Sequence, residues 1–414
     1  MRMVRSIVRW LTTLPMFRSL RHRNYRLFFL GQLVSLIGTW MQNIGQAWLI
    51  YQLTHSSVWL GAVGFLASVP VLLFSMFGGT LADKISKKRL ITATQIASMV
   101  QAFVLALLVW TDSITPAVVG VLAFTLGTIN AFDMPGRQSF VVEMVGKEDL
   151  PNAIALNSAV FNSARMFGPA IGGIVIGLLG VGWCFFLNGV SFIAVIIGLS
   201  LMNVEERIIK KSASSMVQSI RESVAYIRSE VTLKAIMILV AVVTIFGWSY
   251  SVMLPIFADR ILNIGAIGLG NLLTANGIGA LISALTVASF GHKVHPSKFI
   301  YTGLSIFIFS ILVFTASSSP LLSMACMVGV GLGLIAFFAT ANASLQMRTP
   351  DHLRGRVMGL YALVFQGFFP LGSLGLGVLA DVAGVRLAIA GGAGICGVSG
   401  GIMYRVMKKQ NERT

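Results

Sequence analysis

One arginine in this sequence lies deep within an apolar run that is long enough to cross a membrane. Arg165 falls about 16 Å into the run 153–180, close to the middle of a bilayer, at a helical rise of about 1.5 Å per residue. An arginine there costs about 2.5 to 3.5 kcal/mol or more unless it meets water or a partner. Arg165 can therefore anchor an anionic group of a substrate. Alternatively, it can form a structural pair with Asp133 or with backbone carbonyls released by Pro169.

A stripe of polar side chains follows the first long apolar run, 27–53. The side chains recur at intervals of three and four residues, which places them on one face of a helix. Lipid does not tolerate such a face, so the stripe lines either a cavity or an interface between helices. We expect the stripe to bind a substrate together with Arg165. The expected substrate-binding residues are Gln32, Ser35, Thr39, Gln42, Gln46, Asn162, Arg165 and Trp248.

Carboxylates are scarce within the apolar runs. Asp133, in the sequence DMPGR near the end of the run 115–134, is the only one expected within a span. A coupling proton needs a protonatable group that reaches both sides of the membrane in turn. Asp133 is the candidate for that role, although the same sequence allows a structural pair between Asp133 and Arg137.

The remaining reactive residues do not have the spacing of an enzyme or metal site. The five histidines fall at helix ends without ligand spacing, and the three cysteines lie in apolar runs without a CxxC pair. The chain also lacks the G-x-x-x-x-G-K-[ST] loop that cradles nucleotide phosphates. We therefore expect no catalytic residue, no metal and no cofactor. An ion gradient, a substrate gradient or a partner must supply the energy.

The composition determines which elements must position these side chains. With 56% hydrophobic and 11% charged residues and a mean hydropathy of +0.84, the chain cannot cover a soluble core with polar surface. Continuous apolar runs of about 20 residues predict transmembrane helices rather than barrel strands. Twelve such runs lie at 27–53, 58–82, 90–111, 115–134, 153–180, 183–203, 233–257, 268–291, 298–316, 320–345, 357–380 and 386–405.

The chain also repeats itself. The loop GGTLADKISKKR, which begins at Gly78, is echoed 209 positions later, and EMVGKEDLPNAIAL, which begins at Glu143, is echoed 203 positions later. Parallel repeats of this kind are typical of secondary transporters. We therefore predict an all-α integral membrane protein with two six-helix bundles related by a pseudo-two-fold repeat. The expected parts are a basic tail (1–26), an N-terminal bundle (27–203), a linker helix region (204–232), a C-terminal bundle (233–405) and a tail (406–414).

The net charge of +17 is distributed unevenly across the predicted loops. With a cytoplasmic N-terminus, all but three of the 31 Lys and Arg residues are cytoplasmic or in tails, the exceptions being Arg165, Arg260 and Arg386. This positive-inside bias places both termini in the cytoplasm and argues against nucleic-acid binding. The first 26 residues lack a cleavage site. Residues 2–14 form either a short helix on anionic lipid or an extended start.

The loop between the second and third runs carries a family resemblance. GGTLADKISKKR resembles the signature G-x-L-A-D-[RK]-x-G-R-[RK]-[RK] of the major facilitator superfamily, although Ser86 replaces a glycine. The resemblance implies that Asp83 closes the cytoplasmic side by accepting hydrogen bonds from the helix that starts near Arg356. The alternative is a solvated loop that only orients the protein. The expected gating residues are Gly79, Asp83, Lys87, Arg89 and Arg137.

A second motif lies around Arg165. The sequence ARMFGPAIGG resembles the superfamily's antiporter motif, G-x-x-x-G-P-x-x-G-G, which implies export. Its small residues allow another helix to approach and its proline bends the span, so a packing kink is the simpler interpretation. The expected helix-packing residues are Gly168, Pro169, Gly172 and Gly173.

Two longer stretches narrow the resemblance. Residues 17–54 and 133–173 are similar to the branch that contains the enterobactin exporter and other siderophore and macrolide exporters. The resemblance implies a monomeric, proton-coupled exporter of a small anionic and aromatic molecule in the inner membrane, working by alternating access. A multidrug or macrolide efflux pump, an importer and a lipid-moving facilitator are the alternatives. A membrane enzyme or receptor would need clustered reactive residues or an added domain.

Overall fold

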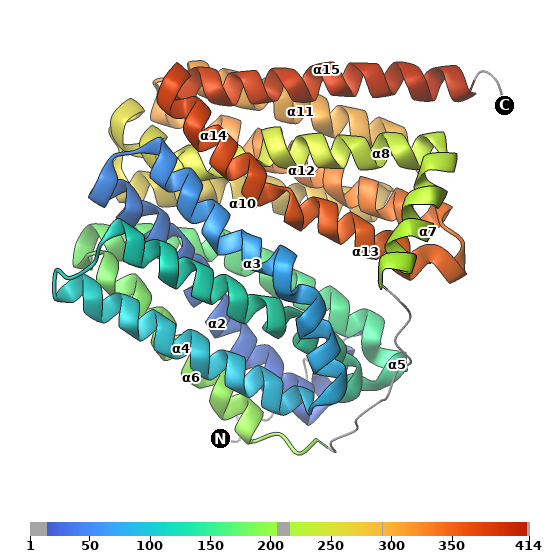
Figure 1. Ribbon diagram of the computed structural model, residues 1–414. Helices are drawn as coiled ribbons and strands as arrows, with labels where there is room; N and C mark the ends of the chain where they lie inside the picture. The colour runs from blue at the N-terminus through green and yellow to red at the C-terminus, as the bar shows by residue number, and fades with distance from the viewer. Residues whose placement is uncertain (1–14, 205–215, 292, 412–414) are drawn as a thin grey trace. The chain divides into compact units, whose positions relative to one another are not determined.

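The computed structural model describes residues 15–204, 216–291 and 293–411, and these ranges consist of helices joined by short connections, without any strand (Figure 1). The surface helix considered for residues 2–14 lies outside the described residues. The first half contains η1 (Pro15–Arg21), α2 (Arg23–Thr54), α3 (Ser57–Lys84), α4 (Lys87–Trp110), α5 (Pro116–Leu179) and α6 (Val181–Ser200).

The second half starts with α7 (Met216–Ser229), which lies in the expected linker region. The helix that follows changes its winding several times and is described by five consecutive elements. These are α8 (Val231–Val242), the π-helical η2 (Val243–Gly247), the 3₁₀-helical η3 (Trp248–Met253), α9 (Leu254–Ile256) and the π-helical η4 (Phe257–Ile261). The rest are α10 (Gly265–Phe290), α11 (Pro296–Ala316), α12 (Pro320–Arg348), α13 (Asp351–Gly367), α14 (Phe369–Ala383) and α15 (Val385–Asn411).

The helices give the twelve predicted membrane crossings. Eleven helical segments of the described chain are long and apolar enough to cross a bilayer. One of them, α5, has 64 residues, about three times the length that a single crossing needs. Gly146, at φ 72° and ψ 178°, interrupts its helical geometry between the two predicted runs. Such a backbone geometry is essentially limited to glycine, so Gly146 divides α5 into two spans.

Equivalent glycines close the last turn of each half. Gly180 joins α5 to α6 at φ 95°, and Gly384 joins α14 to α15 at φ 86°. Both positions need a left-handed backbone that a side chain disfavours. The two links lie 204 positions apart in the sequence, close to the offset of the second sequence repeat. The structural repeat therefore extends to the single-residue connections.

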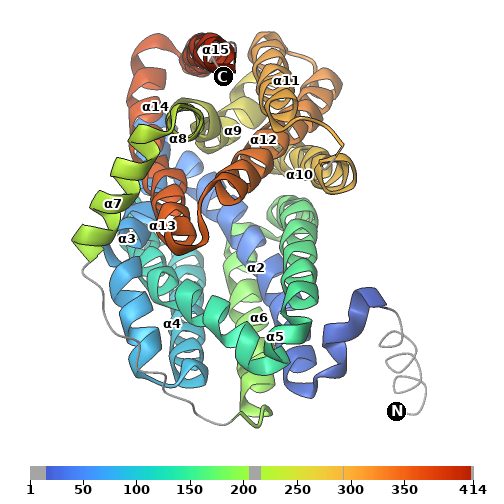
Figure 2. The same cartoon turned by 90° about the vertical axis from the view of Figure 1, so that its right-hand side faces the viewer.

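The chain forms two compact units. The described parts of residues 1–46 and 73–211 belong to unit 1, and those of residues 47–72 and 212–414 belong to unit 2. In unit 1, α4 packs along α5 and α6, and in unit 2, α12 packs along α10 and α11 while α15 packs along α11 (Figures 1 and 2). The last turns of α2 and the beginning of α3 thus belong with the C-terminal helices. We use "basic end" for the end of each unit that carries the loop at 85–86 or at 291–295.

A buried carboxylate ties η1 to α5 at the basic end of unit 1. Asp149 lies between the two spanning halves of α5 and is 2% exposed. Its Oδ2 atom is 2.7 Å from Nε2 of His22 and 2.9 Å from the guanidinium of Arg21, and Oδ1 is 2.7 Å from Nε of Arg18. The hydrogen bond with His22 and the positive charges of Arg18 and Arg21 hold the pKa of Asp149 below its ordinary value. The cluster therefore fixes the start of the first span.

Candidate functional site

The site in unit 1 begins with a close approach of α2 and α5. A Cβ atom on Gly168 would lie 2.5 Å from Cβ of Trp40, and one on Gly172 would lie 2.6 Å from Cγ2 of Ile44. Only glycine permits this separation. Pro169 and Gly173 are buried in the same turn. The contact fixes the depth at which Arg165 lies in the span, relative to the polar stripe of α2.

Arg165 lies half-buried in the second spanning half of α5, nearly one turn before Gly168. Since Gly168 faces Ile37 and Trp40, Arg165 is level with the part of α2 that precedes them. Asn162, one turn earlier, donates from Nδ2 to the carbonyl of Ser158 at 2.8 Å. The structure thus brings the arginine and the stripe to a similar depth in the same unit.

The stripe on α2 divides into two parts. In the first part Gln32 and Ser35 are buried, Thr39 donates to the carbonyl of Ser35 at 2.9 Å, and Nε2 of Gln32 has no hydrogen-bond partner within the described residues. A buried amide without a partner costs about 1 to 3 kcal/mol. This part of the stripe retains an unused donor group. Gln46, near the other end of the stripe, is half-buried.

Gln42 belongs to the second part, which bonds to other helices. Its Nε2 donates to Oε1 of Gln101 at 3.1 Å, and its Oε1 accepts from Nδ2 of Asn188 at 2.7 Å. Gln101 in turn donates to the carbonyl of Leu122 at 3.2 Å. At Gln42 the structure therefore has the helix interface that the sequence left as the alternative to a cavity wall. Its side chain, 1% exposed, joins α2, α4 and α6.

Asp133 is the centre of a second polar network in unit 1. Its Oδ1 atom accepts from Oγ1 of Thr94 at 2.6 Å and from Nε2 of Gln95 at 3.2 Å, and its Oδ2 atom pairs with Arg137. The carboxylate is buried and the guanidinium is mostly buried. The pair that the sequence offered as one alternative is thus present, and two donors from α4 support it. A carboxylate bonded in this way can release its arginine when it takes up a proton.

The signature loop at the basic end is short and well defined. Ser86, which replaces the usual glycine, caps α4 by accepting a hydrogen bond from the backbone N–H of Arg89. The serine therefore supplies a helix cap, for which its hydroxyl is well suited. Lys87 is buried and pairs with Glu143, whereas Asp83 is exposed and Gly79 has open space around its Cα atom. Among the gating candidates, Lys87 and Arg137 thus form ion pairs inside unit 1.

Trp248 lies in an aromatic cluster in unit 2. Its ring centroid is 5.1 Å from that of Phe338 and 5.3 Å from that of Phe365, and the ring of Tyr361 stacks on Phe365 at 5.9 Å. Trp248 is the first residue of η3, next to the π-helical turn η2. Changes of winding inside a helix often mark hinges and functional positions. The cluster offers aromatic faces beside such a position.

A third polar group in unit 2 lies at the end opposite to the basic end. The hydroxyl of Tyr51 donates to Oδ2 of Asp259 at 2.6 Å, and Arg260 donates to the carbonyl of His55 at 2.9 Å. The guanidinium of Arg260 also lies 5.9 Å from the centre of the Tyr51 ring. We call Tyr51, His55, Asp259 and Arg260 the outer latch. It joins the end of α2 to η4.

Comparisons with known proteins identify the family of this chain. The profile of the family described as "Transmembrane secretion effector" matches residues 15–413. The chain belongs to this family. It is accordingly a transporter of the major facilitator superfamily and not an enzyme.

The relatives of this chain include siderophore transporters and a multidrug efflux pump. The chain is 27% identical to the staphyloferrin A transporter of Staphylococcus aureus, over 89% of the chain and 93% of that protein. It is 26% identical to the multidrug efflux pump Tap of Mycolicibacterium fortuitum (87% and 90%) and 23% identical to the enterobactin exporter EntS of Escherichia coli (85% and 83%). The fold is also similar to that of the nucleoside transporter NupG, with a TM-score of 0.70 at 14% identity, over 93% of this chain and 98% of that one.

Sequence reasoning missed the outer latch and the partners of Gln42. Tyr51 and Asp259 are 208 residues apart, and no periodic pattern connects them. For the Gln42 network a signal was present, because Gln101 and Asn188 are amide side chains inside apolar runs. Buried amides in a span need partners, so each could have been assigned to an interhelical bond.

Proposed function

We propose that this transporter exports a small anionic molecule of the siderophore class, driven by protons. The observation that carries the proposal is the similar depth of Arg165 and of a polar stripe in which the buried amide of Gln32 has no hydrogen-bond partner within the described parts of the chain. A cation and N–H donors at one depth are suited to a carboxylate or catecholate. Three relatives that act on siderophores or drugs support the export of such a molecule.

Proton coupling would use the Asp133–Arg137 pair. A proton on Asp133 removes the negative charge that holds Arg137. The released guanidinium would then be available to Asp83, the exposed acid of the signature loop in the same unit. In this proposal, uptake of a proton changes the charge at the basic end, which we assign to the cytoplasm on the basis of the positive-inside bias. Proton binding is thereby linked to opening and closing of that end.

The outer latch would act at the other end. Its Tyr51–Asp259 hydrogen bond involves a carboxylate, and such bonds contribute about 1.5 to 3 kcal/mol. That range corresponds to roughly a tenfold to hundredfold preference for the bonded state. The latch would thus hold the opposite end closed while the basic end exchanges substrate.

A multidrug efflux pump is the second candidate, and the aromatic cluster around Trp248 favours it. Aromatic faces bind neutral and cationic amphiphiles as well as aromatic anions. The alignment with Tap covers a similar share of both chains to the alignments with the siderophore transporters. The two candidates differ in whether Arg165 is needed for every substrate.

Transport by membrane vesicles tests the proposal. Inverted vesicles with an acidic lumen should accumulate a carboxylate siderophore, and collapse of the pH gradient should release it. Right-side-out vesicles with an alkaline lumen, which carry the gradient in its physiological sense, serve as the control for direction. Accumulation in right-side-out vesicles would indicate an importer. Uptake of neutral and cationic dyes, with no uptake of the siderophore, would indicate the multidrug alternative.

A further inference from the structure

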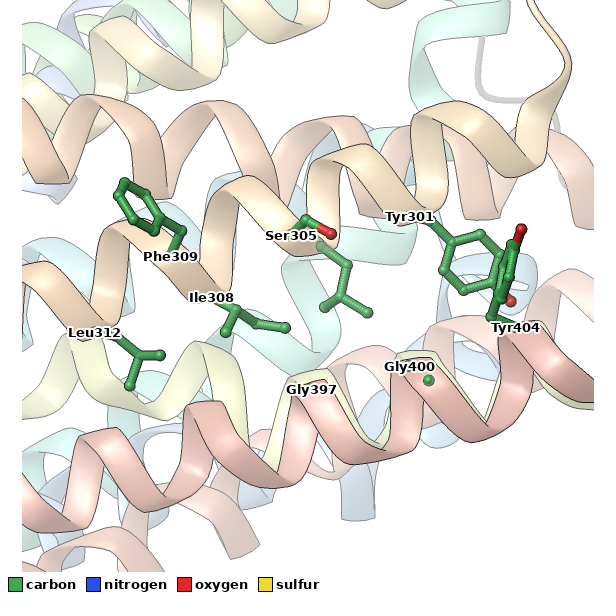
Figure 3. A pocket seen from close by; sticks show the side chains of 10 residues that line it. Tyr301, Ser305, Ile308, Phe309, Leu312, Gly397, Gly400 and Tyr404 are labelled. Atoms are coloured by element: carbon green, nitrogen blue, oxygen red, sulfur yellow. The ribbon is translucent and has the colours of Figure 1, made fainter.

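A long groove lies between α11 and α15 in unit 2, and none of its lining residues belongs to the sites described above. It has a volume of about 520 Å³, which falls within the range of pockets that bind small molecules. Leu304, Ile308 and Leu312 of α11 form one wall, and the glycines of α15 form the other (Figure 3). The lining is apolar along most of its length. Both helices are membrane spans.

The glycines give the groove its depth. Gly400 packs against Leu304, where a Cβ atom would lie 2.7 Å from Cδ2 of the leucine. Gly401, in contrast, has no atom within 4 Å of the place where a Cβ atom would be. A methyl group at residue 401 would therefore meet no protein atom within 4 Å. Residue 401 thus lines the groove with backbone alone.

Two tyrosines close the groove at the basic end. The rings of Tyr301 and Tyr404 meet edge to face with centroids 5.0 Å apart (Figure 3). The hydroxyl of Tyr301 is 3.2 Å from the sulfur of Met407. Tyrosine is enriched at the level of lipid headgroups because its ring is apolar and its hydroxyl is polar. The pair thus indicates where the hydrocarbon region ends on this face.

Positive charge follows one turn beyond each tyrosine. Lys298 precedes Tyr301 by three residues on α11, and Lys408 follows Tyr404 by four residues on α15, so each lysine shares a helix face with its tyrosine. Both lysines are exposed. Along the two helices, the apolar groove is followed by the two tyrosines and then by the two lysines. This order matches that of acyl chain, glycerol region and phosphate in an anionic phospholipid.

The length of the groove agrees with one acyl chain. Residues 301 to 312 of α11 span about 16 Å at a rise of about 1.5 Å per residue. One leaflet contributes about half of a hydrocarbon core that is about 30 Å thick. We propose that this groove binds one phospholipid of the leaflet at the basic end, with an acyl chain along Gly397, Gly400 and Gly401 and an anionic phosphate near Lys298 and Lys408.

Native mass spectrometry of the full-length protein tests the proposal with two lipids that share their acyl chains, phosphatidylglycerol and phosphatidylcholine. The protein should retain phosphatidylglycerol more strongly. Lys298→Ala and Lys408→Ala should each lower that preference roughly fivefold, as expected for one cation near an anionic surface. Inorganic phosphate at millimolar concentration should not displace the lipid.

A matched pair of glycine variants tests the acyl-chain part. Gly401→Leu should abolish retention of both lipids because its side chain fills the groove. Gly394→Leu is the control, since Gly394 is on the same helix, also has open space at its Cβ position and does not line the groove. Leucine favours a helix more than glycine does, so both variants should fold. Equal retention by the two variants, or no preference between the lipids in the unsubstituted protein, would overturn the proposal.

Discussion

The two units carry different chemistry. Unit 1 holds Asp133 and Arg137 in a network with Thr94 and Gln95 and carries Arg165 in a span. Unit 2 has aromatic rings around Trp248, and the buried hydroxyls of Thr244 and Thr340 in its spans have no hydrogen-bond partner among the described residues. The repeat therefore preserved the helices while the side chains diverged. We infer that unit 1 supplies charge recognition and coupling, and that unit 2 supplies apolar surface.

The largest effect should follow from the loss of the carboxylate in unit 1. Asp133→Asn keeps an acceptor for Thr94 and Gln95 but removes the charge opposite Arg137, so no proton can be carried there. We expect transport against a gradient to be lost while transport down a gradient continues. Both rates are measured in liposomes with and without a pH gradient.

The double variant with Arg137→Gln separates coupling from folding. If the pair is only structural, removal of both charges should restore much of the stability that a single change costs, about 3 to 5 kcal/mol for a buried pair. Restored uphill transport in the double variant would contradict a coupling role for Asp133. Equal loss of uphill and downhill transport in Asp133→Asn, with poor expression, would do the same.

A smaller effect is expected at the outer latch of unit 2. Tyr51→Phe removes one hydrogen bond to a carboxylate and leaves the ring in place, so the opposite end should open roughly ten times as often. Labelling of a Thr54→Cys variant by a membrane-impermeant thiol reagent should rise by that factor. Gln52→Cys, at an exposed position, is the control and should label equally in both backgrounds. An unchanged labelling rate at Thr54→Cys would mean that the outer latch does not hold this end closed.

Glycine substitutions should distinguish the tight packing of unit 1 from an open surface of unit 2. Gly168→Ala should lower the free energy of unfolding by about 1 to 3 kcal/mol, because the new methyl group meets Trp40 at 2.5 Å. Gly391→Ala is the matched control, with open space at its Cβ position. Thermal unfolding in detergent measures both. Similar melting temperatures for the two variants would mean that α2 and α5 are not in such close contact.

The sequence was sufficient for the scaffold because lipid imposes simple rules. A span must be continuous, apolar and long enough, so all twelve crossings could be predicted. The repeated loops and the uneven distribution of charge predicted two bundles and their orientation. The same rules could not separate a cavity wall from a helix interface at Gln42, because a polar face is excluded from lipid in both cases.

Contacts between distant residues were beyond the sequence for a physical reason. The hydrogen bond of Tyr51 with Asp259 and the pairing of Asp149 with η1 join residues more than 100 positions apart. Local periodicity carries no information on such partners. At Ser86 the family pattern itself was misleading, because a serine that breaks the glycine pattern caps the next helix. Each of these features needed three-dimensional placement.

The division of roles between the units is tested most directly by binding of one ligand in two charge states. A carboxylate siderophore and its neutral methyl ester should be titrated against Arg165→Ala, Arg165→Lys and Trp248→Ala by isothermal titration calorimetry in detergent. Arg165→Ala should weaken binding of the acid at least roughly tenfold and leave the ester unchanged, as expected for a lost charge-assisted bond. Arg165→Lys should recover part of the loss, and Trp248→Ala should weaken both ligands equally. If Arg165→Ala binds the acid normally, or loses acid and ester to the same extent, unit 1 does not recognise charge through this residue.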